Sequence, residues 1–583
     1  MALRWLVLAP ILLPWLGALV VWLARSRRGQ VQPWLAVGFA IMAALATLAL
    51  LPVATTEAAL NIDTGGIFGA FTLVPDGLGV FLASIATVIG SLAIIFSMAY
   101  MQSEAQPGRY YALVLLFIGS MAGLVLSGSL LFLFLFWEMT AFCSYALISY
   151  HNDDPRAVAG GIKALIITQV GGVGLLLASL LAYAYLGDYQ VATLLAGAPT
   201  LPAGILGAIA FGCLLAAAAK SAQVPLHTWL PDAMAAPTPV SALIHAATMV
   251  NAGVYLLARF YPAFAPVPGW KTAVITVALL SALLAGLMAL VATDLKRVLA
   301  YSTISQLGFM VYAVGIGAIF ASQLHLLSHA VFKALLFLAA GAIIHTLDTR
   351  DMQQMGGLWR QMPFVARVFV IGAAALLGLP LLNGFWSKEL ILEAGLAQGP
   401  LWAYIGMLLG TGITALYTVR MVWFVCFGPP PAGKVVHATP LAMRLALAPL
   451  ALAALTTWLV AGRFASWLAS TLPNHHLDLL STTELVTHVL FNVATVATLA
   501  LVTLALALWW SRDRLAWATK RLGRLQVAAA QGFGFEWLNR RLAQMVQDTA
   551  GALQMTQTGQ LNWNVAGMMI GLVVILAVLA GGQ

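Results

Sequence analysis

A single carboxylate stands near the middle of an apolar stretch that is long enough to cross a membrane. The stretch reads LLFLFLFWEMTAFCSYALISY (residues 130–150), and Glu138 has apolar neighbours for most of two helical turns on either side. A charged side chain at that depth costs on the order of a few kcal/mol, so it is expected to face protein or water and to serve a function. We therefore expect Glu138 to have a buried cationic partner, and Lys220 is the candidate.

Lysine and histidine occur in similar apolar surroundings. Lys220, Lys333 and Lys388 fall within predicted spans, and so does His245, whereas the remaining lysines, Lys296 among them, are assigned to loops or to the segment 511–561. The cost of burying a charge in hydrocarbon predicts that the residues within spans line a protein interior.

Three titratable residues share one stretch, LHLLSHAVFK, where His325, His329 and Lys333 are spaced i, i+4 and i+8. This spacing places them about 6 Å apart along one face of a helix. Such a row is suited to proton transfer, because burial brings lysine and carboxylate side chains toward the proton affinity of histidine. A glutamate beside a lysine also forms a switch, since separating the two charges changes the proton affinity of the lysine. A structural ion pair, and a packing role for His245, are the alternatives.

The elements that hold these residues are predicted to be membrane helices. Of 583 residues, 62% are hydrophobic and 8% are charged, against about a quarter charged in soluble domains. Apolar runs of about 17–25 residues predict an all-α polytopic membrane protein with about sixteen spans, near 5–24, 34–53, 77–101, 110–127, 129–150, 161–187, 203–230, 239–260, 272–292, 298–317, 320–346, 363–396, 401–427, 441–461, 487–510 and 562–580. The first run is interpreted as a membrane helix rather than a cleaved signal peptide.

Two of these spans are expected to be broken. Pro225 interrupts 203–230, and Pro380 with Gly384 interrupts 363–396. Irregular backbone at membrane depth is tolerated where it is buried in protein or lines a water-filled cavity, and broken helices in both halves of a chain are typical of transporters.

Basic residues predict the orientation of the spans. They crowd one set of loops, while the other set keeps only Arg4, Arg259, Lys271 and Arg463. By the positive-inside rule, both termini and the loops 54–76, 188–202 and 462–486 are expected on the outer, periplasmic side. The net charge of +9 is accordingly interpreted as a topology signal rather than as a nucleic-acid-binding feature.

Segment 511–561 is not predicted to span the membrane. Its residues 536–553 place their apolar side chains on one helical face, which predicts a short amphipathic helix in the plane of the membrane interface. A solvated linker with a helical tendency is the alternative.

Several long motifs resemble the antiporter-like subunits of respiratory complex I, particularly the large subunit called subunit 5 or L. The motifs are KSAQVPLHTWLPDAMAAPTPVSALIHAATMVNAGVYLLAR (220–259), TDLKRVLAYSTISQLGFM (293–310), HLLSHAVFKALLFLAAGAIIH (325–345), MGGLWRQMP (355–363) and LNGFWSKE (382–389). The resemblance implies two inverted five-helix bundles, each with a broken helix. It divides the chain into N-terminal helices 1–109, a first bundle 110–260, a second bundle 272–427, C-terminal helices 428–510, an interfacial segment 511–561 and a last helix 562–583.

The same resemblance assigns roles by motif match. It implies that Glu138 and Lys220 form the pair of the first bundle. It makes His245, His329 and Lys333 the central relay, and it places Lys388, beside Glu389, on the outlet side.

Three features depart from the complex I pattern. Complex I subunits often carry Asp where Gly172 stands, and the double glycine there, like TRDMQQMGGL, is more similar to the large subunit of multisubunit Na⁺/H⁺ antiporters. Those antiporters, however, often carry Lys where this chain has Asn251. The interfacial segment is also much shorter than the lateral helix of the complex I subunit.

The sequence therefore favours a proton-translocating subunit of an NADH:quinone oxidoreductase-type complex in the cell inner (plasma) membrane. NAD, FMN, iron–sulfur clusters and quinone are expected in partner subunits, because this chain has no dinucleotide fingerprint, and Cys143, Cys213 and Cys426 are isolated. The stretch NHHLD (474–478) is interpreted as an exposed loop rather than a metal site. The alternatives are a subunit of a monovalent cation (Na⁺)/proton antiporter, and an energy-coupling membrane subunit of a hydrogenase or of an inorganic-carbon uptake complex.

Overall fold

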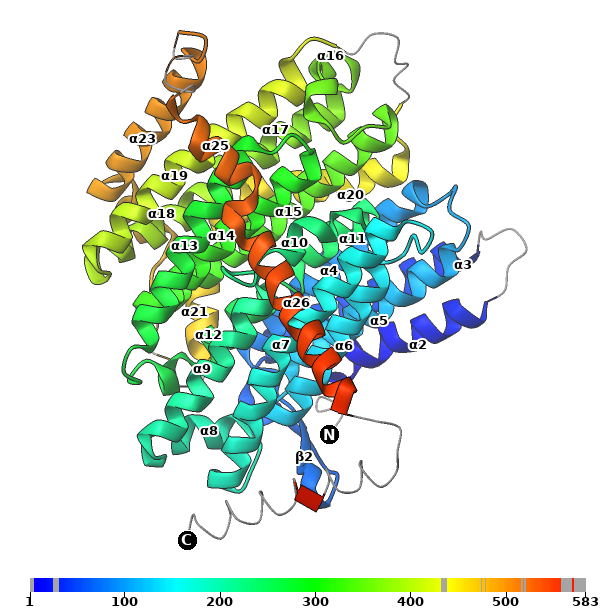
Figure 1. The fold of residues 1–583 in the computed structure, drawn as a ribbon, viewed down its shortest axis with the longest axis vertical. Coiled ribbons are helices and arrows are strands. Elements are labelled where there is room, and N and C mark those ends of the chain that lie inside the picture. The colour runs from blue at the N-terminus through cyan, green and yellow to red at the C-terminus, as the bar shows by residue number, and fades with distance from the viewer. Residues whose placement is uncertain are drawn as a thin grey trace. The chain divides into compact units, whose positions relative to one another are not determined.

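The computed structural model of the chain consists of two units, Met1–Leu522 and Gly523–Gln583, and each is described by itself. It describes residues 5–24, 31–430, 438–472, 474–475, 477, 479–514, 517, 521–556 and 569–570. Figure 1 shows that the first unit is built almost entirely of helices.

Thirteen helical segments in the described part of the chain are long and apolar enough to cross a membrane. All thirteen coincide with predicted spans, which confirms the all-α polytopic membrane fold. Their helices are α3 (Val31–Leu50), α4 (Gly77–Tyr100), α5 (Pro107–Leu126), α6 (Leu130–Ile148), α7 (Pro155–Leu186), α9 (Ala203–Lys220), α11 (Thr238–Ala242) continued by α12 (Asn251–Phe264), α13 (Trp270–Val291), α14 (Leu295–Ile316), α15 (Ile319–Leu347), α19 (Leu401–Val422), α20 (Leu441–Thr456) continued by α21 (Ala461–Thr471), and α23 (Val493–Trp510).

Three predicted spans have no counterpart among the thirteen. The first corresponds to α2 (Ala9–Leu23), an apolar helix of 15 residues. The second, 363–396, is divided into α17 (Pro363–Leu377) and α18 (Asn383–Gln398). The third, 562–580, lies outside the described residues apart from 569–570.

Both spans that are predicted to be broken are interrupted in the structure. The helix α9 ends at Lys220, and the chain passes through turns to the short helix α10 (Trp229–Asp232). The backbone freed there finds protein partners, since Gln223 N donates to the carbonyl of Ala218 at 2.7 Å and Val224 N donates to Ser281 Oγ at 2.9 Å. Pairing of this kind satisfies irregular backbone at membrane depth.

The second break separates α17 from α18. Gly378 ends α17 in the left-handed region with φ +88°, and Leu381 follows with φ +74°. Gly384 lies directly against the carbonyl of Ala375, where any Cβ would collide. The glycine therefore allows the start of α18 to lie against the end of α17.

A third irregularity was not predicted. Residues Leu243–Ala247, between α11 and α12, form a π-helix, and Thr248 follows with φ −131° and ψ −101°. Single turns of π-helix inside membrane helices are often found at functional sites. This turn carries His245.

The helices form two groups with the same order of neighbours. In the first group α7 packs against α6 and α9, and in the second α15 packs against α14 and α17. Figure 1 shows the first group in cyan to green and the second in green to yellow. The helix α15 also packs against α11 and the π-helix, so it joins the two groups.

A short hairpin and isolated β-bridges connect loops at the ends of the helices. Strands β1 (Leu60–Asp63) and β2 (Ala70–Leu73) form an antiparallel hairpin within the loop 54–76. Isolated bridges join Leu73 to Ser127 and Ser129 to Gln190, while Asp294 pairs with Asp351. The loops 54–76 and 188–202, which the orientation prediction puts on one side, are therefore neighbours.

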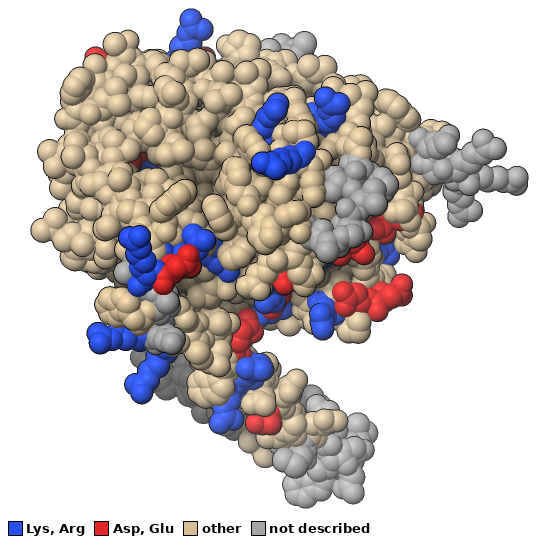
Figure 2. Space-filling view, turned by 90° about the horizontal axis from the view of Figure 1, so that it is seen from above, with Lys and Arg blue, Asp and Glu red and all other residues tan. Residues whose placement is uncertain are grey.

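Charged side chains occupy little of the visible surface. In the space-filling view of Figure 2, Lys, Arg, Asp and Glu gather in a few groups, and wide areas of the visible face carry none of them. On α7, large apolar side chains are about half exposed, among them Ile166, Val170, Val173 and Leu177. Such a surface suits hydrocarbon or another membrane subunit.

The second unit contains α25 (Gly523–Ala530) and α26 (Phe535–Thr556). The helix predicted over 536–553 is thus present as part of α26. Its apolar side chains Leu542, Met545, Val546 and Leu553 are all more than half exposed.

Candidate functional site

Lys220 is the last residue of α9 and is fully buried. Its Nζ donates a hydrogen bond of 2.8 Å to the carbonyl of Trp137 on α6, and it lies 4.9 Å from the centre of the Trp137 ring. The break after α9 therefore ends the helix where its lysine contacts a neighbouring membrane helix. The ammonium has one hydrogen bond and one cation–π contact, so it can still donate to a further group.

Glu138 follows Trp137, and its carboxyl group lies in the same region. The two groups are close enough for Glu138 and Lys220 to interact electrostatically. They do not form a direct ion pair within 4.0 Å, and both carboxyl oxygens are buried without a hydrogen-bond partner among the described residues. The predicted partners therefore interact electrostatically without a direct ion pair.

Gly172 on α7 explains how the carboxyl group fits. A Cβ at this position would collide with Glu138 Oε1. The double glycine that departs from the complex I pattern therefore provides the space into which the Glu138 side chain extends.

His245 lies in the π-helix between α11 and α12 and is fully buried. Its ring lies 6.4 Å from the ring of Trp229 and 5.7 Å from that of Phe337, and neither ring nitrogen has a hydrogen-bond partner among the described residues. Trp229 Nε1 donates to the carbonyl of Ala219, beside Lys220, at 3.0 Å. The indole therefore links the end of α9 to the imidazole.

The row His325, His329 and Lys333 lies on α15, and all three side chains are fully buried. His325 contacts Ser387 Oγ through Nδ1 at 2.9 Å and Gln306 Oε1 through Nε2 at 3.1 Å. Its imidazole therefore connects α15 to both α14 and α18.

The other two members of the row have different surroundings. Lys333 Nζ donates to Ser302 Oγ on α14. His329 has no hydrogen-bond partner among the described residues, and its ring lies edge-on to Phe332 at 5.5 Å. His329 interacts electrostatically with Lys333 and His325, so the three side chains act on one another.

Lys388 and Glu389 are buried near the start of α18. Lys388 Nζ donates to the carbonyl of Leu376 at 2.8 Å and to that of Leu377 at 3.4 Å. These are the last carbonyls of α17, so the ammonium caps the first half of the broken helix. Lys388 also interacts electrostatically with Lys333 and His325.

Sequence reasoning assigned Lys296 to a loop, and this was wrong. Lys296 is the second residue of α14, is 1% exposed, and donates to the carbonyl of Ala236 at 2.6 Å. It also interacts electrostatically with His245. The N-cap residue Asp294 could have indicated that the helix begins before this lysine.

Arg259 was likewise assigned to a loop and is buried within α12. It forms a bidentate ion pair with Asp76, whose Oδ1 also accepts from Gly79 N at 2.9 Å. Tyr255 OH accepts from the Arg259 guanidinium at 3.2 Å and donates to the carbonyl of Val125 at 3.0 Å. We call Asp76, Arg259 and Tyr255 the arginine clamp.

Asp232, at the end of α10, forms a further charged group that was not predicted. It accepts from Lys163 Nζ at 2.8 Å and from Arg297 at 2.9 Å. These contacts connect α7, α10 and α14, and the three side chains are 21–49% exposed.

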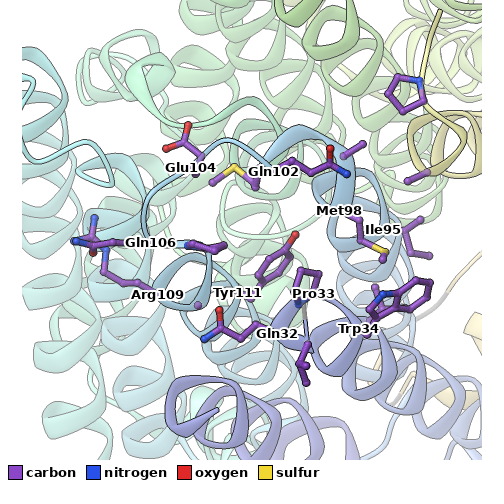
Figure 3. Close-up of a pocket in the computed structure, with 18 of the residues that line it drawn as sticks. Gln32, Pro33, Trp34, Ile95, Met98, Gln102, Glu104, Gln106, Arg109 and Tyr111 are labelled. Atoms are coloured by element: carbon purple, nitrogen blue, oxygen red, sulfur yellow. The ribbon is translucent and has the colours of Figure 1, made fainter. Parts of the chain in front are cut away.

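A large open pocket lies elsewhere. It has a volume of about 1750 Å³ and is lined by the α4–α5 loop, the start of α3 and the start of α20, and Figure 3 shows Glu104, Arg109, Gln32 and Trp34 at its edge. None of the predicted site residues lines it. Within the described part of the chain, no group of three or more His, Cys, Asp and Glu side chains is arranged to hold a metal ion.

Known proteins share both the sequence and the fold. Residues 127–414 match the family described as "NADH:quinone oxidoreductase/Mrp antiporter, TM", and residues 62–111 match "NADH-Ubiquinone oxidoreductase (complex I), chain 5 N-terminus". The chain is 38% identical over 549 residues to NADH-quinone oxidoreductase subunit L of Escherichia coli, and the alignment covers 87% of each protein. It is also 38% identical to a probable K(+)/H(+) antiporter subunit of Rhizobium meliloti, over 77% of this chain but only 46% of that protein.

Among solved structures, a chain of the Mrp complex from Dietzia sp. has a TM-score of 0.85 at 29% identity. The match covers 100% of this chain and 63% of that one, so the present chain spans less than two thirds of both antiporter-type proteins. The sequence matches and the shared fold together show that the chain belongs to the family of membrane subunits common to NADH:quinone oxidoreductases and Mrp antiporters.

Proposed function

We propose that this chain is a proton-translocating subunit of an NADH:quinone oxidoreductase-type complex, in which redox chemistry in partner subunits drives protons along its buried side chains. The observation that carries the proposal is a run of buried titratable groups through both broken helices. The run begins at Glu138, which is half-buried but whose carboxyl oxygens are buried. Its other members are buried side chains: Lys220, His245, the α15 row His325, His329 and Lys333, and then Lys388 with Glu389. Ionisable groups inside a membrane protein mark ion pathways by default.

The first bundle works as the switch. With the Glu138 carboxylate nearby, the ammonium of Lys220 is stabilised. When the carboxylate moves away, the desolvated ammonium gives up its proton, and Trp229 leads from the end of α9 to the imidazole of His245. No direct ion pair has to be broken for this step, because the Glu138 carboxyl group is not within 4.0 Å of the Lys220 ammonium.

The second bundle works as the relay. Phe337 packs on the imidazole of His245 and lies one turn from Lys333, so the two titratable groups lie near the same side chain. Because a phenyl ring carries no proton, water must pass the proton between them. Ser302, Gln306 and Ser387 supply hydroxyl and amide groups to the α15 row. Both ring nitrogens of His329 lack a hydrogen-bond partner among the described residues. Internal water normally satisfies buried polar atoms of this kind. Water at these atoms would complete a proton path.

The proposed function also implies partner subunits. NAD, FMN, iron–sulfur clusters and quinone are assigned to other subunits of a hetero-oligomeric complex in the bacterial inner membrane. The exposed apolar side chains of α7 suit contact with a neighbouring membrane subunit.

The proposed topology places both termini on the periplasmic side. A reporter fused after Gln583 should then report a periplasmic location, and one inserted near Gln531 a cytoplasmic location. Two reporters on the same side would contradict the arrangement.

We assign α26 to the membrane interface. Leu542→Asp and Val546→Asp each place a charge among its exposed apolar side chains. Both variants should insert normally but assemble less firmly, seen as subunit loss on native gels. Unchanged assembly would favour the solvated-linker alternative.

Two observations favour a second candidate, a subunit of a monovalent cation/proton antiporter. Gly172 is similar to the antiporter pattern, and it is the residue that makes room for Glu138. The fold match to the Mrp complex also extends over the whole chain.

Inverted membrane vesicles that contain the full complex distinguish the two functions. For the proposed function, NADH should drive proton uptake without added Na⁺ or K⁺, and Lys220→Ala should abolish that uptake. Lys271→Ala, at an exposed lysine at the start of α13, is the matched control and should pump normally. Proton movement that requires a Na⁺ or K⁺ gradient and ignores NADH would establish the antiporter function instead.

A further inference from the structure

The buried run does not end at Lys388 and Glu389. Glu389 is 1% exposed, and its Oε2 has no hydrogen-bond partner among the described residues. Thr495 and Thr498, on α23, face its carboxyl group. A buried carboxyl group with a free oxygen and hydroxyl neighbours is able to accept a proton and pass it on.

Glu393 lies one turn further along α18. It interacts electrostatically with Glu389, and the i, i+4 spacing puts the two side chains about 6 Å apart on one helix face. Glu393 Oε1 lies 3.4 Å from His488 Nδ1, whereas its Oε2 is buried without a partner among the described residues. One oxygen of Glu393 therefore faces the interior and the other faces the histidine.

Exposure increases along this series. Glu389 is buried, the Glu393 side chain is 20% exposed, and that of His488 is 56% exposed. The three titratable groups thus lead from the buried lysine of α18 to the surface. In the proposed topology that surface is the periplasmic one.

The histidine is held by a helix outside the two bundles. His488 lies on α22 (Thr482–Leu490), which packs against α18 and α21. A capping box fixes the start of α22, with Ser481 N donating to Glu484 Oε2 at 2.7 Å and Glu484 N donating to Ser481 Oγ at 3.1 Å. This helix lies beyond residue 414, where the match to the family's main model ends.

We propose that Glu389, Glu393 and His488 form the outlet through which the proton leaves, with His488 as the terminal group. The proposal rests on the proposed function, because it requires protons to arrive at Lys388. The carboxylic acid of Glu389 gives its proton to the Glu393 carboxylate, directly or through water. Glu393 then protonates His488 at Nδ1, and the imidazolium releases a proton from Nε2 to bulk water. Tautomer exchange through water returns the proton on Nδ1 to Nε2, so that Nδ1 can accept the next one.

If the contact between Glu393 and His488 has only a structural role, a different outcome is expected. An exposed ion pair contributes little to stability. Its loss should leave assembly and turnover intact, so an effect on pumping separates the two roles.

The experiment uses the full complex in inverted vesicles with NADH as the driving substrate. The initial rate of membrane-potential formation per complex is measured with a potential-sensitive dye. A pH gradient is not used as the signal, because one arm of the experiment adds imidazole, a permeant weak base that would dissipate such a gradient. We expect His488→Ala and Glu393→Gln to slow this rate about tenfold, less than the full effect of losing a general acid–base group because water can partly replace it. Glu57→Gln, at an exposed carboxylate in the loop 54–76, is the control and should have no effect.

Added imidazole provides the decisive test. The His488 site is exposed enough for imidazole to enter, so it should restore most of the rate in His488→Ala and leave Glu393→Gln unchanged. A normal rate in both variants, or a slow rate in His488→Ala that imidazole does not restore, would overturn the outlet. Lys388→Ala in the same assay tests the underlying function separately, since normal pumping there would refute the proton path itself.

Discussion

The arginine clamp and the buried run are both made of charged side chains inside the membrane region, but they are satisfied to different degrees. In the clamp, Asp76 and Arg259 contact each other directly, and Tyr255 and Gly79 bind the remaining atoms. In the run, neither carboxyl oxygen of Glu138 and neither ring nitrogen of His245 has a hydrogen-bond partner among the described residues. The clamp is fully paired, whereas some members of the run, Glu138, His245 and His329, have buried polar atoms without a hydrogen-bond partner among the described residues.

This difference distinguishes a structural ion pair from side chains that carry protons. A buried ion pair with all its hydrogen bonds made is costly to open, so it holds α4 and α12 together and its charges stay in place. A proton carrier needs the opposite arrangement, since it must exchange partners with small changes in free energy. Burial of charge by itself therefore does not identify the pathway; incomplete pairing does.

The largest effect is expected at the clamp. Arg259→Leu leaves the Asp76 carboxylate buried without its cation and should lower stability by about 3–5 kcal/mol. The complex should assemble poorly, as measured by native gels and thermal denaturation in detergent. Arg463→Leu, at an exposed arginine on α21, is the control. Normal assembly of Arg259→Leu with defective pumping would place the clamp in the pathway.

The next effect concerns Glu138 and Lys220. Glu138→Gln removes the charge that stabilises the ammonium, and Lys220→Ala removes the ammonium itself. Both should abolish most proton uptake per complex, and the double variant should be little worse than either single one, with a coupling free energy of about 0.5–3 kcal/mol. Assembly should be retained. Normal pumping by Glu138→Gln alongside failure of Lys220→Ala would show that Glu138 has another partner.

A smaller effect is expected at Gly172. In Gly172→Ala the new Cβ meets the flexible end of Glu138, which can swing aside, so stability should change by less than about 1 kcal/mol. Proton uptake should fall to between the wild-type rate and that of Glu138→Gln. Gly204→Ala, on α9 with nothing within 4 Å of its Cβ, is the matched control. Equal uptake in both alanine variants would mean that the position of the Glu138 carboxyl group does not matter.

The smallest effect is expected at Asp232. Its contacts with Lys163 and Arg297 are partly exposed, so Asp232→Asn should cost about 0.2–1 kcal/mol for each pair and lower the melting temperature only slightly. The change should shrink further at high salt. If Asp232→Asn instead stops proton uptake at normal stability, this carboxylate belongs to the pathway and not to the scaffold.

The predictions from sequence succeeded where the physical cause is local. Apolar runs of sufficient length identified thirteen spans of the described chain, because transfer of a helix into hydrocarbon is a sum over its own residues. Pro225 and Pro380 marked both broken helices, since a missing N–H acts on its own helix. The assignments of Lys296 and Arg259 failed because the positive-inside rule counts residues near helix ends without knowing where the helices begin and end.

The amino-acid sequence alone determined the fold class, the positions of the helix breaks and the identity of the ionisable groups that had to be buried. Only the tertiary structure decided what each of them contacts: Lys220 bonds to the carbonyl of Trp137, and His325 joins Gln306 to Ser387, 81 residues apart. The reason is that the free energy of burial depends on each residue's own segment, whereas a contact depends on the rotation and depth of two packed helices. That packing determines whether a buried charged group is fully paired, as in the clamp, or lacks hydrogen-bond partners, as at Glu138 among the described residues.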